Sequence, residues 1–151
     1  MKKLLSYMFI VLLVSCWTAR YHDISSTHEY AHVVGKKFNT LEELLIFGYS
    51  KNNNNFETID SYVITEKPGI GGREVLSRDS LPIGSVIHVK RILVCTNCIF
   101  SIFFQIIVEV VSDDRYSGEF VEIIDSGNIF VSRSNGAAVE LNPRLFEPEM
   151  D

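Results

Sequence analysis

The clearest candidates for chemistry are two histidines and a glutamate near the amino terminus. His28, Glu29 and His32 have the spacing H-E-x-x-H, in which two histidines one helical turn apart can bind zinc while the glutamate activates a water molecule. A catalytic zinc site needs three protein ligands. The longer form of this pattern places its third ligand at Phe38, and phenylalanine cannot coordinate a metal, so the set is incomplete.

The residues around this motif disfavour the helix that zinc chemistry requires. Gly35 and the β-branched Val33 and Val34 follow it, and these residue types lower helix propensity. Metalloproteases of the longer pattern resemble the sequence only as far as Gly35. Residues 17–32 are polar without steady periodicity, which is typical of a tether. We therefore expect no catalytic residue, metal or cofactor, with a zinc peptidase and adventitious metal binding as the alternatives.

The first sixteen residues have the organisation of an export signal. Lys2 and Lys3 form a positively charged start, and residues 4–14 are an apolar run too short to span a bilayer comfortably. The run ends in Leu-Val-Ser-Cys at residues 13–16. This string resembles the lipobox of bacterial lipoproteins, which implies cleavage before Cys16 and attachment of lipid, such as palmitate, to that cysteine. An ordinary secretory signal or an uncleaved anchor is the alternative.

The resemblance to lipoproteins also implies an organisation and a location. We expect a signal peptide at residues 1–15, a polar tether at 16–32 and one folded domain at 33–151. Loss of Lys2 and Lys3 leaves 12 of 14 basic residues against 19 acidic ones, a formal side-chain charge of −7. Such a charge argues against a nucleic-acid partner. Trp17 rather than aspartate follows the cysteine, and in lipoproteins this implies the outer membrane, facing the periplasm.

Cys95 and Cys98 form a second pair with possible chemistry. A redox C-x-x-C motif uses a helix N-terminus to lower the thiol pKa, whereas this pair stands between two strand-like runs. A structural zinc site would need a second pair of ligands, and the only other cysteine is Cys16. An even pair in an oxidising compartment predicts a disulfide between Cys95 and Cys98, with free thiols as the alternative.

The longest β-type stretch covers residues 81–112. Runs of β-branched and aromatic residues at 86–94 and 99–111 flank the turn-forming Thr96-Asn97 and predict a long hairpin. Along the returning arm, period-2 alternation gives one fully apolar face. The residues of that face are Phe100, Ile102, Phe104, Ile106, Val108 and Val110. This hairpin is therefore expected to be a central pair with a buried side.

The rest of the chain predicts an all-β fold around this hairpin. Short strand-like runs near residues 33–38, 44–50, 62–64, 120–124 and 129–132 alternate with turn signals. One or two short helical turns are expected, after Thr40 and in the tail at 141–146. The folded part is small for a two-sheet sandwich, so we expect a closed antiparallel barrel, which removes sheet edges.

A weak motif points to a particular kind of barrel. Leu81-Pro82-x-Gly84, followed by Val89 in a long strand, resembles small bacterial barrels of the Src-homology-3 type. There such a turn follows an irregular loop, here residues 66–80, beside which the domain binds its partner. The resemblance implies that this loop is the contact surface, and we expect Ile70, Arg73 and Glu74 to contact the partner.

These observations favour a non-enzymatic binding module anchored in the bacterial cell envelope. We expect it to be held to the membrane through lipid on Cys16 and to bind a protein or peptidoglycan partner. Three alternatives remain: an immunity-like lipoprotein that neutralises a toxin, a purely structural envelope component, and a zinc peptidase that uses His28, Glu29 and His32.

Overall fold

The structure is a computed structural model that describes residues 19–51, 56–98, 104–124, 130–132 and 139–150. Cys16 and the export signal lie outside these residues, as do Phe100 and Ile102 of the predicted apolar face. Within the described ranges the chain forms eleven strands and one short 3-10 helix. The all-β prediction is confirmed. In the part of the chain that is described, no helix is long and apolar enough to cross a membrane.

The strands are short apart from the central pair. In chain order the elements are β1 (Tyr21–Asp23), β2 (Lys37–Thr40), β3 (Leu44–Tyr49), β4 (Ser61–Thr65), β5 (Val75–Leu81), β6 (Val86–Cys95), β7 (Phe104–Val110), the 3-10 helix η1 (Asp114–Tyr116), β8 (Val121–Ile124), β9 (Phe130–Ser132), β10 (Val139–Leu141) and β11 (Phe146–Pro148).

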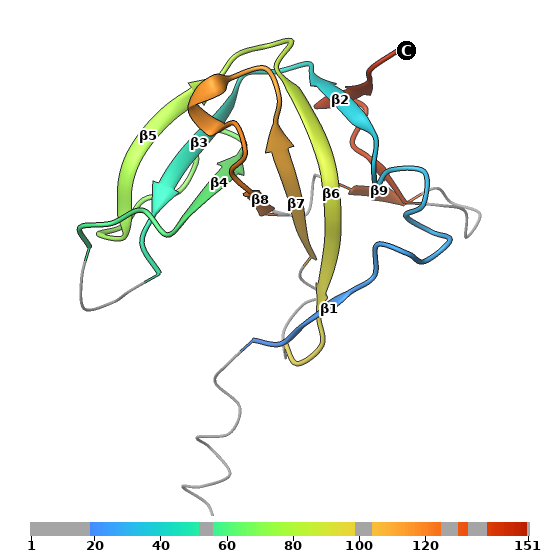
Figure 1. Ribbon diagram of the computed structural model, residues 1–151, viewed down its shortest axis with the longest axis horizontal. Helices are drawn as coiled ribbons and strands as arrows, with labels where there is room; N and C mark the ends of the chain where they lie inside the picture. Colours follow the sequence, from blue (N-terminus) through green and yellow to red (C-terminus); the bar gives the residue numbers. More distant parts are fainter. Residues whose placement is uncertain (1–18, 52–55, 99–103, 125–129, 133–138, 151) are drawn as a thin grey trace, which may run out of the picture.

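Nine of these strands form one curved sheet (Figure 1). Its order is β11-β2-β6-β7-β8-β4-β3-β5, and β1 pairs with β6 beside this path. Neighbouring strands are antiparallel except β4 and β8, which are parallel. The strands β9 and β10 form a separate two-stranded sheet. Along one side of β6, β2 pairs with its first residues and β1 with its last, so β6 organises the amino-terminal half.

The sheet is open, so the prediction of a closed barrel is wrong. Among the described strands its edges are β5, which pairs only with β3, and β11, which pairs only with β2. The strand β11 covers the side of β2 on which a closing strand would have to pair. It ends in Pro148, which lacks the backbone N–H that a further ladder would need. The described strands therefore show a β-rich sheet and not a small barrel.

The turn at residues 81–85 joins β5 to β6 and is hydrogen-bonded to the end of β2. The Thr40 hydroxyl donates to the Pro82 carbonyl at 2.9 Å, and the Gly84 N–H donates to the Thr40 carbonyl at 2.8 Å. Gly84 has a φ of 82°, which glycine adopts without the steric cost of a side chain. The Leu-Pro-x-Gly string thus forms a compact turn that starts β6, as its sequence predicted.

The core contains the predicted apolar face of the hairpin. Ile106, Val108 and Val110 are fully buried, and Phe104 packs partly buried against the same cluster. The described part of that face is confirmed. Other members come from β3, β4, β5, β6, β8 and the carboxyl-terminal turn. The largest fully buried side chains include Phe47, Ile46, Ile64, Leu81, Ile87, Ile92, Ile123 and Leu145.

The hairpin connection differs from the prediction. Val94 pairs with Phe104, so Thr96-Asn97 is not a two-residue turn between paired strands. On its other side the end of β6 pairs with β1, where Cys95 is the partner of Tyr21. Residues 99–103 of the predicted returning arm lie outside the described residues.

Two smaller predictions are also corrected. The irregular loop predicted at residues 66–80 ends before Val75, where β5 begins. No helix follows Thr40, because the apolar run enters the sheet as β3. The tail forms strands β10 and β11 around a single turn at residues 142–146, in which Leu145 and Phe146 both donate to the Asn142 carbonyl as in a helical turn. The one helix among the described residues is η1.

The predicted polar tether is largely part of the fold. The strand β1 pairs with β6, the Ile24 N–H donates to the Ile92 carbonyl at 3.0 Å, and the Gly35 N–H donates to the Val89 carbonyl at 2.8 Å. Tyr30 is only 4% exposed and its ring lies 6.3 Å from that of Phe104. Polar composition concealed this packing because backbone hydrogen bonds hold the segment and few of its side chains point inward.

Candidate functional site

The histidine motif does not form the site that its spacing suggested. His28, Glu29 and His32 are exposed and lie in a series of turns, not on an α-helix. The Tyr30 N–H donates to the Thr27 carbonyl and the Val33 N–H to the Tyr30 carbonyl, so the direction of the chain changes at each step. Across the described ranges, no three His, Cys, Asp or Glu side chains gather as a possible metal site.

The three predicted partner contacts lie on the connection between β4 and β5, and each is engaged within the fold. The Arg73 guanidinium lies 5.6 Å from the centre of the Phe56 ring. The Ile70 carbonyl accepts a hydrogen bond from Arg78 at 3.1 Å, and the Glu74 carbonyl accepts one from the backbone of Ser50 at 2.9 Å. Their role as partner contacts stays a prediction.

A groove of about 710 Å³ lies between β2, β10, β11 and the turns before β2. We call it the β2–β11 groove. Its floor is apolar and well packed: Val33, Phe38, Leu141 and Phe146 line it and are each under 10% exposed. The described side chains at its rim that carry charge or can titrate are His32, Lys36, Lys37, His88, Glu140 and Glu149.

The rim places charges of both signs beside the apolar floor. The ammonium of Lys37 lies 3.6 Å from the Glu149 carboxylate. Lys36 is exposed and forms no ion pair with any described residue. Two lysines face two glutamates here, although the chain as a whole has a net charge of −5. The groove is therefore less acidic than the rest of the molecule.

On the β6 side of the groove, His88 is half-buried and is the ladder partner of Lys37. Its Nδ1 lies 3.9 Å from the Glu109 carboxylate, which accepts a hydrogen bond from Lys90 at 2.8 Å. The hydrogen bond and positive charge of Lys90 lower the pKa of Glu109, and His88 adds a smaller effect. The contacts of His88 and Lys90 with Glu109 hold these two β6 side chains in place beside the groove.

The lining of the groove combines apolar side chains with charged and titratable ones, which is the usual composition of a binding site. The sequence analysis did not single out this groove, because His32 and His88 come to line it only through the pairing of β2 with β6.

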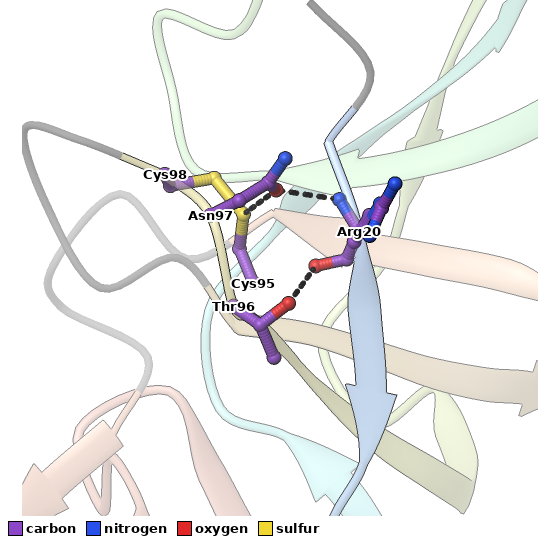
Figure 2. The surroundings of a disulfide bond; sticks show 5 residues. All are labelled: Arg20, Cys95, Thr96, Asn97 and Cys98. Atoms are coloured by element: carbon purple, nitrogen blue, oxygen red, sulfur yellow. Dashed lines mark hydrogen bonds between the residues drawn. A yellow bond between two sulfur atoms is a disulfide. The ribbon is translucent and has the colours of Figure 1, made fainter. Parts of the chain in front are cut away.

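The disulfide pair lies at the other end of β6 (Figure 2). Cys95 and Cys98 are joined with a Cα–Cα distance of 5.8 Å, as the sequence predicted. Between them, the Thr96 N–H and hydroxyl donate to the Arg20 carbonyl at 2.8 and 3.1 Å. The Arg20 N–H donates to the Asn97 side-chain oxygen at 2.7 Å. The loop closed by the disulfide thus holds the start of the described chain.

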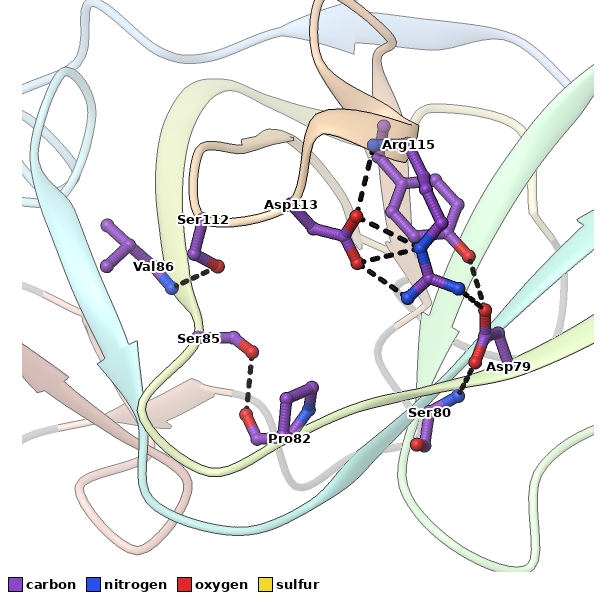
Figure 3. Close-up of polar contacts among 9 residues, drawn as sticks. Asp79, Ser80, Pro82, Ser85, Val86, Ser112, Asp113 and Arg115 are labelled. Carbon is purple, nitrogen blue, oxygen red and sulfur yellow. Dashed lines mark hydrogen bonds and ion pairs between the residues drawn. The ribbon is translucent and has the colours of Figure 1, made fainter.

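A polar cluster joins η1 to the edge strand β5 (Figure 3). The Arg115 guanidinium donates to Asp113 at 2.7 Å and also to Asp79 of β5. The Tyr116 hydroxyl donates to Asp79 at 3.4 Å. Burial raises the pKa of Tyr116, and the Asp79 charge raises it further. Arg115 is exposed, and its contacts with Asp79 and Asp113 fasten η1 to one edge of the sheet.

Comparisons with known proteins were made at three levels. A scan against protein-family models, a search of curated proteins and a search of solved structures each found no match.

Proposed function

We propose that this protein is a lipid-anchored, non-enzymatic binding protein of the bacterial cell envelope, and that it binds a protein or peptidoglycan partner in the β2–β11 groove. The anchor is lipid on Cys16, and the domain faces the periplasm from the outer membrane. The groove is the observation that carries the binding role, because it combines an apolar floor with charged groups of both signs.

The composition of the groove favours a peptide as the bound group. Phe38 and Phe146 form part of the apolar floor, while Lys36 and the Lys37–Glu149 pair at the rim can meet carboxylates and amines. Both a protein segment and the peptide of a cell wall carry such groups next to apolar side chains. Sites of this kind bind through buried apolar contact and use a few polar groups for orientation.

The anchor is tested by acyl labelling. We expect a radiolabelled or clickable fatty acid to be incorporated into the wild-type chain, and Cys16→Ala to abolish incorporation and block signal cleavage. Cys98→Ala is the matched control, because it removes a cysteine that lies outside the lipobox and should leave labelling intact. Undiminished labelling of Cys16→Ala would show that the anchor is elsewhere.

The binding site is tested by photo-crosslinking of the full chain in cells. A benzoylphenylalanine in place of Lys36 probes the groove, one in place of Arg73 probes the predicted loop, and one at the exposed Ser117 is the control. We expect a specific adduct, with protein or with sedimented peptidoglycan, from position 36 and none from position 117. An adduct from position 73 alone would show that the partner binds at the β4–β5 connection. Small barrels of the Src-homology-3 type bind their partners beside the corresponding loop.

A toxin-neutralising role is the second candidate function. The formal charge of −7 on the expected mature chain suits a basic partner, and opposite charge accelerates association. If this is the function, the adduct from position 36 contains a basic toxin, and deletion of the gene makes cells sensitive to that toxin. The enzyme alternative has no comparable support in the placement of His28, Glu29 and His32.

A further inference from the structure

We infer that the end of the sheet at which β6 reaches Cys95 is held against the phospholipid surface. The tether between the lipid and the fold is then three residues long (17–19) rather than sixteen (17–32). The inference rests on the lipid anchor at Cys16 in the proposed function. Its surface is the exposed, polar group of Arg20, Thr96 and Asn97. The partner that fits this group is a layer of phospholipid headgroups.

The first step is the length of chain between the lipid and the fold. Only Trp17, Thr18 and Ala19 separate Cys16 from Arg20. A fully extended chain spans at most ~3.6 Å per residue, so the Cα atom of Arg20 lies within about 14 Å of the Cα atom of the lipidated cysteine. The anchor therefore keeps Arg20 close to the headgroups.

The second step is that Arg20 is already fixed to the sheet. Its carbonyl and N–H bond to Thr96 and Asn97, respectively. The ladder of β1 with β6 follows directly, and the Ile92 N–H then donates to the Ser25 hydroxyl at 2.9 Å. Residues 20–35 can lengthen the tether only if these bonds break and Tyr30 leaves the core. The loop that carries Thr96 and Asn97 must therefore lie about as close to the membrane as Arg20 does.

The third step is the direction of β6. This strand has ten residues, Val86–Cys95, and a strand rises ~3.3 Å per residue, so its two ends are about 30 Å apart. Figure 1 shows β1 at the lower end of β6 and the turn from β5 at its upper end. Ile83 in that turn is 68% exposed. It therefore marks the end of the sheet that points away from the membrane.

This orientation also places the β2–β11 groove. His88, which lines it, comes seven residues before Cys95 on β6. At ~3.3 Å per residue that is about 23 Å from the membrane-facing end. A partner in the aqueous space or in the cell wall can reach the groove without entering the headgroup layer.

The test uses the full lipidated chain on vesicles of phosphatidylethanolamine and phosphatidylglycerol that contain a nitroxide-headgroup lipid. Trp17, the only tryptophan, is replaced by phenylalanine. One probe is Thr96→Trp, which keeps the backbone N–H that donates to Arg20, and its matched probe is Ile83→Trp at the far end. We expect the nitroxide to quench the Thr96→Trp emission several-fold more than that of Ile83→Trp.

A longer tether provides the control for this difference. Insertion of about a dozen glycine and serine residues between Thr18 and Ala19 gives a flexible linker, and we expect it to reduce the quenching of Thr96→Trp towards that of Ile83→Trp. Equal quenching of the two probes without the insertion would overturn the inference, as would stronger quenching of Ile83→Trp.

Vesicle flotation separates this inference from the proposed function. If the wild-type chain carries no lipid and does not float with vesicles, the anchor fails and the orientation fails with it. If the chain floats and the Thr96→Trp emission is unaffected by the nitroxide, the anchor stands and the orientation alone is wrong. Far-ultraviolet circular dichroism and thermal melting of both probe variants establish that the sheet is intact.

Discussion

Single polar residues in this protein act mainly on the fold, and Asp113 shows how. Its carboxylate caps η1 by accepting from the Arg115 N–H at 3.0 Å, and it accepts a second hydrogen bond from the Arg115 guanidinium at 2.7 Å. These bonds favour the ionised form, so Arg115 lowers the pKa of Asp113 below its ordinary value of 3.8. The same guanidinium contacts Asp79, so one arginine links β5 to η1.

The first prediction concerns acid stability. Because the pKa of Asp113 is lower in the folded state than in the unfolded chain, the unfolded chain binds the proton first as pH falls, and stability is lost below about pH 3.8. We expect the melting temperature of the wild type to fall more steeply below pH 4 than that of Asp113→Asn. Asp114→Asn, its exposed neighbour, is the control with the same change in charge. Parallel pH profiles for wild type and Asp113→Asn would refute the assignment.

Among the elements, the amino-terminal segment is the one whose structure differs most from the structure that the sequence predicted. A strand of three residues and a series of turns replace the expected tether. Few contacts fasten this segment: the ladder with β6, the hydrogen bonds to Arg20, and the burial of Tyr30 and Val33. The histidine motif contributes exposed side chains to these turns, so its spacing reflects neither a helix nor a metal site in the described chain.

The second prediction separates the packed residue of this segment from its exposed ones. Tyr30→Ala removes a buried aromatic ring, and such changes cost ~3 kcal/mol of the free energy of unfolding. His28→Ala and His32→Ala change exposed side chains and should stay within about 0.5 kcal/mol. Urea unfolding of all three variants measures the difference. Equal stability of Tyr30→Ala and His28→Ala would support the hypothesis that this segment is a tether. Loss of a stoichiometric zinc from His28→Ala would support the hypothesis of a metal site.

The third prediction concerns the loop that holds β1. We expect Cys95 and Cys98 to be oxidised in protein taken from the periplasm, so that alkylation without reduction leaves both unmodified by mass spectrometry. Reduction should loosen the loop and speed hydrogen exchange at the Thr96 amide, which donates to Arg20. The amide of the buried Val108 on β7 is the control and should be unaffected. Two alkylated thiols in the native protein would count against the disulfide.

At the scale of the whole molecule, the open sheet leaves two edges to protect from pairing with other chains. The strand β11 is short and ends in proline, which limits further pairing. The strand β5 has seven residues and carries Arg78 and Asp79 near its centre. The Arg78 guanidinium lies 5.0 Å from the centre of the Phe47 ring and also bonds to the Ile70 carbonyl. A charge at an edge disfavours the approach of a second strand.

The fourth prediction tests this protection. Arg78→Thr removes the charge from β5 and supplies a residue with high β propensity, so we expect increased self-association in light scattering and size-exclusion chromatography. Lys90→Thr is the matched control, because it removes the same charge from the central strand β6. If both variants self-associate to the same extent, the cause is the change in net charge and not the loss of a charge from the edge strand β5.

The sequence determined the features that depend on neighbours along the chain. Period-2 alternation from Phe104 to Val110 predicted the buried face of β7, and a Leu-Pro-x-Gly string predicted the turn before β6. The two-residue spacing of Cys95 and Cys98 allowed a disulfide, and the structure joins them. Each of these follows from local geometry: strand side chains alternate between faces, and glycine permits the backbone angles of a tight turn.

Only the tertiary structure decided which strands pair and where a groove forms. The ladder between Tyr21–Asp23 and β6 uses backbone groups that every residue except proline has, so a polar sequence does not reveal it. Closure of the sheet depended on whether β11 or another strand would cover β2, and no local pattern encodes that choice. The β2–β11 groove gathers residues from positions 32 to 149. Its existence depends on these long-range pairings, because residues so far apart in the chain meet only when the sheet is assembled.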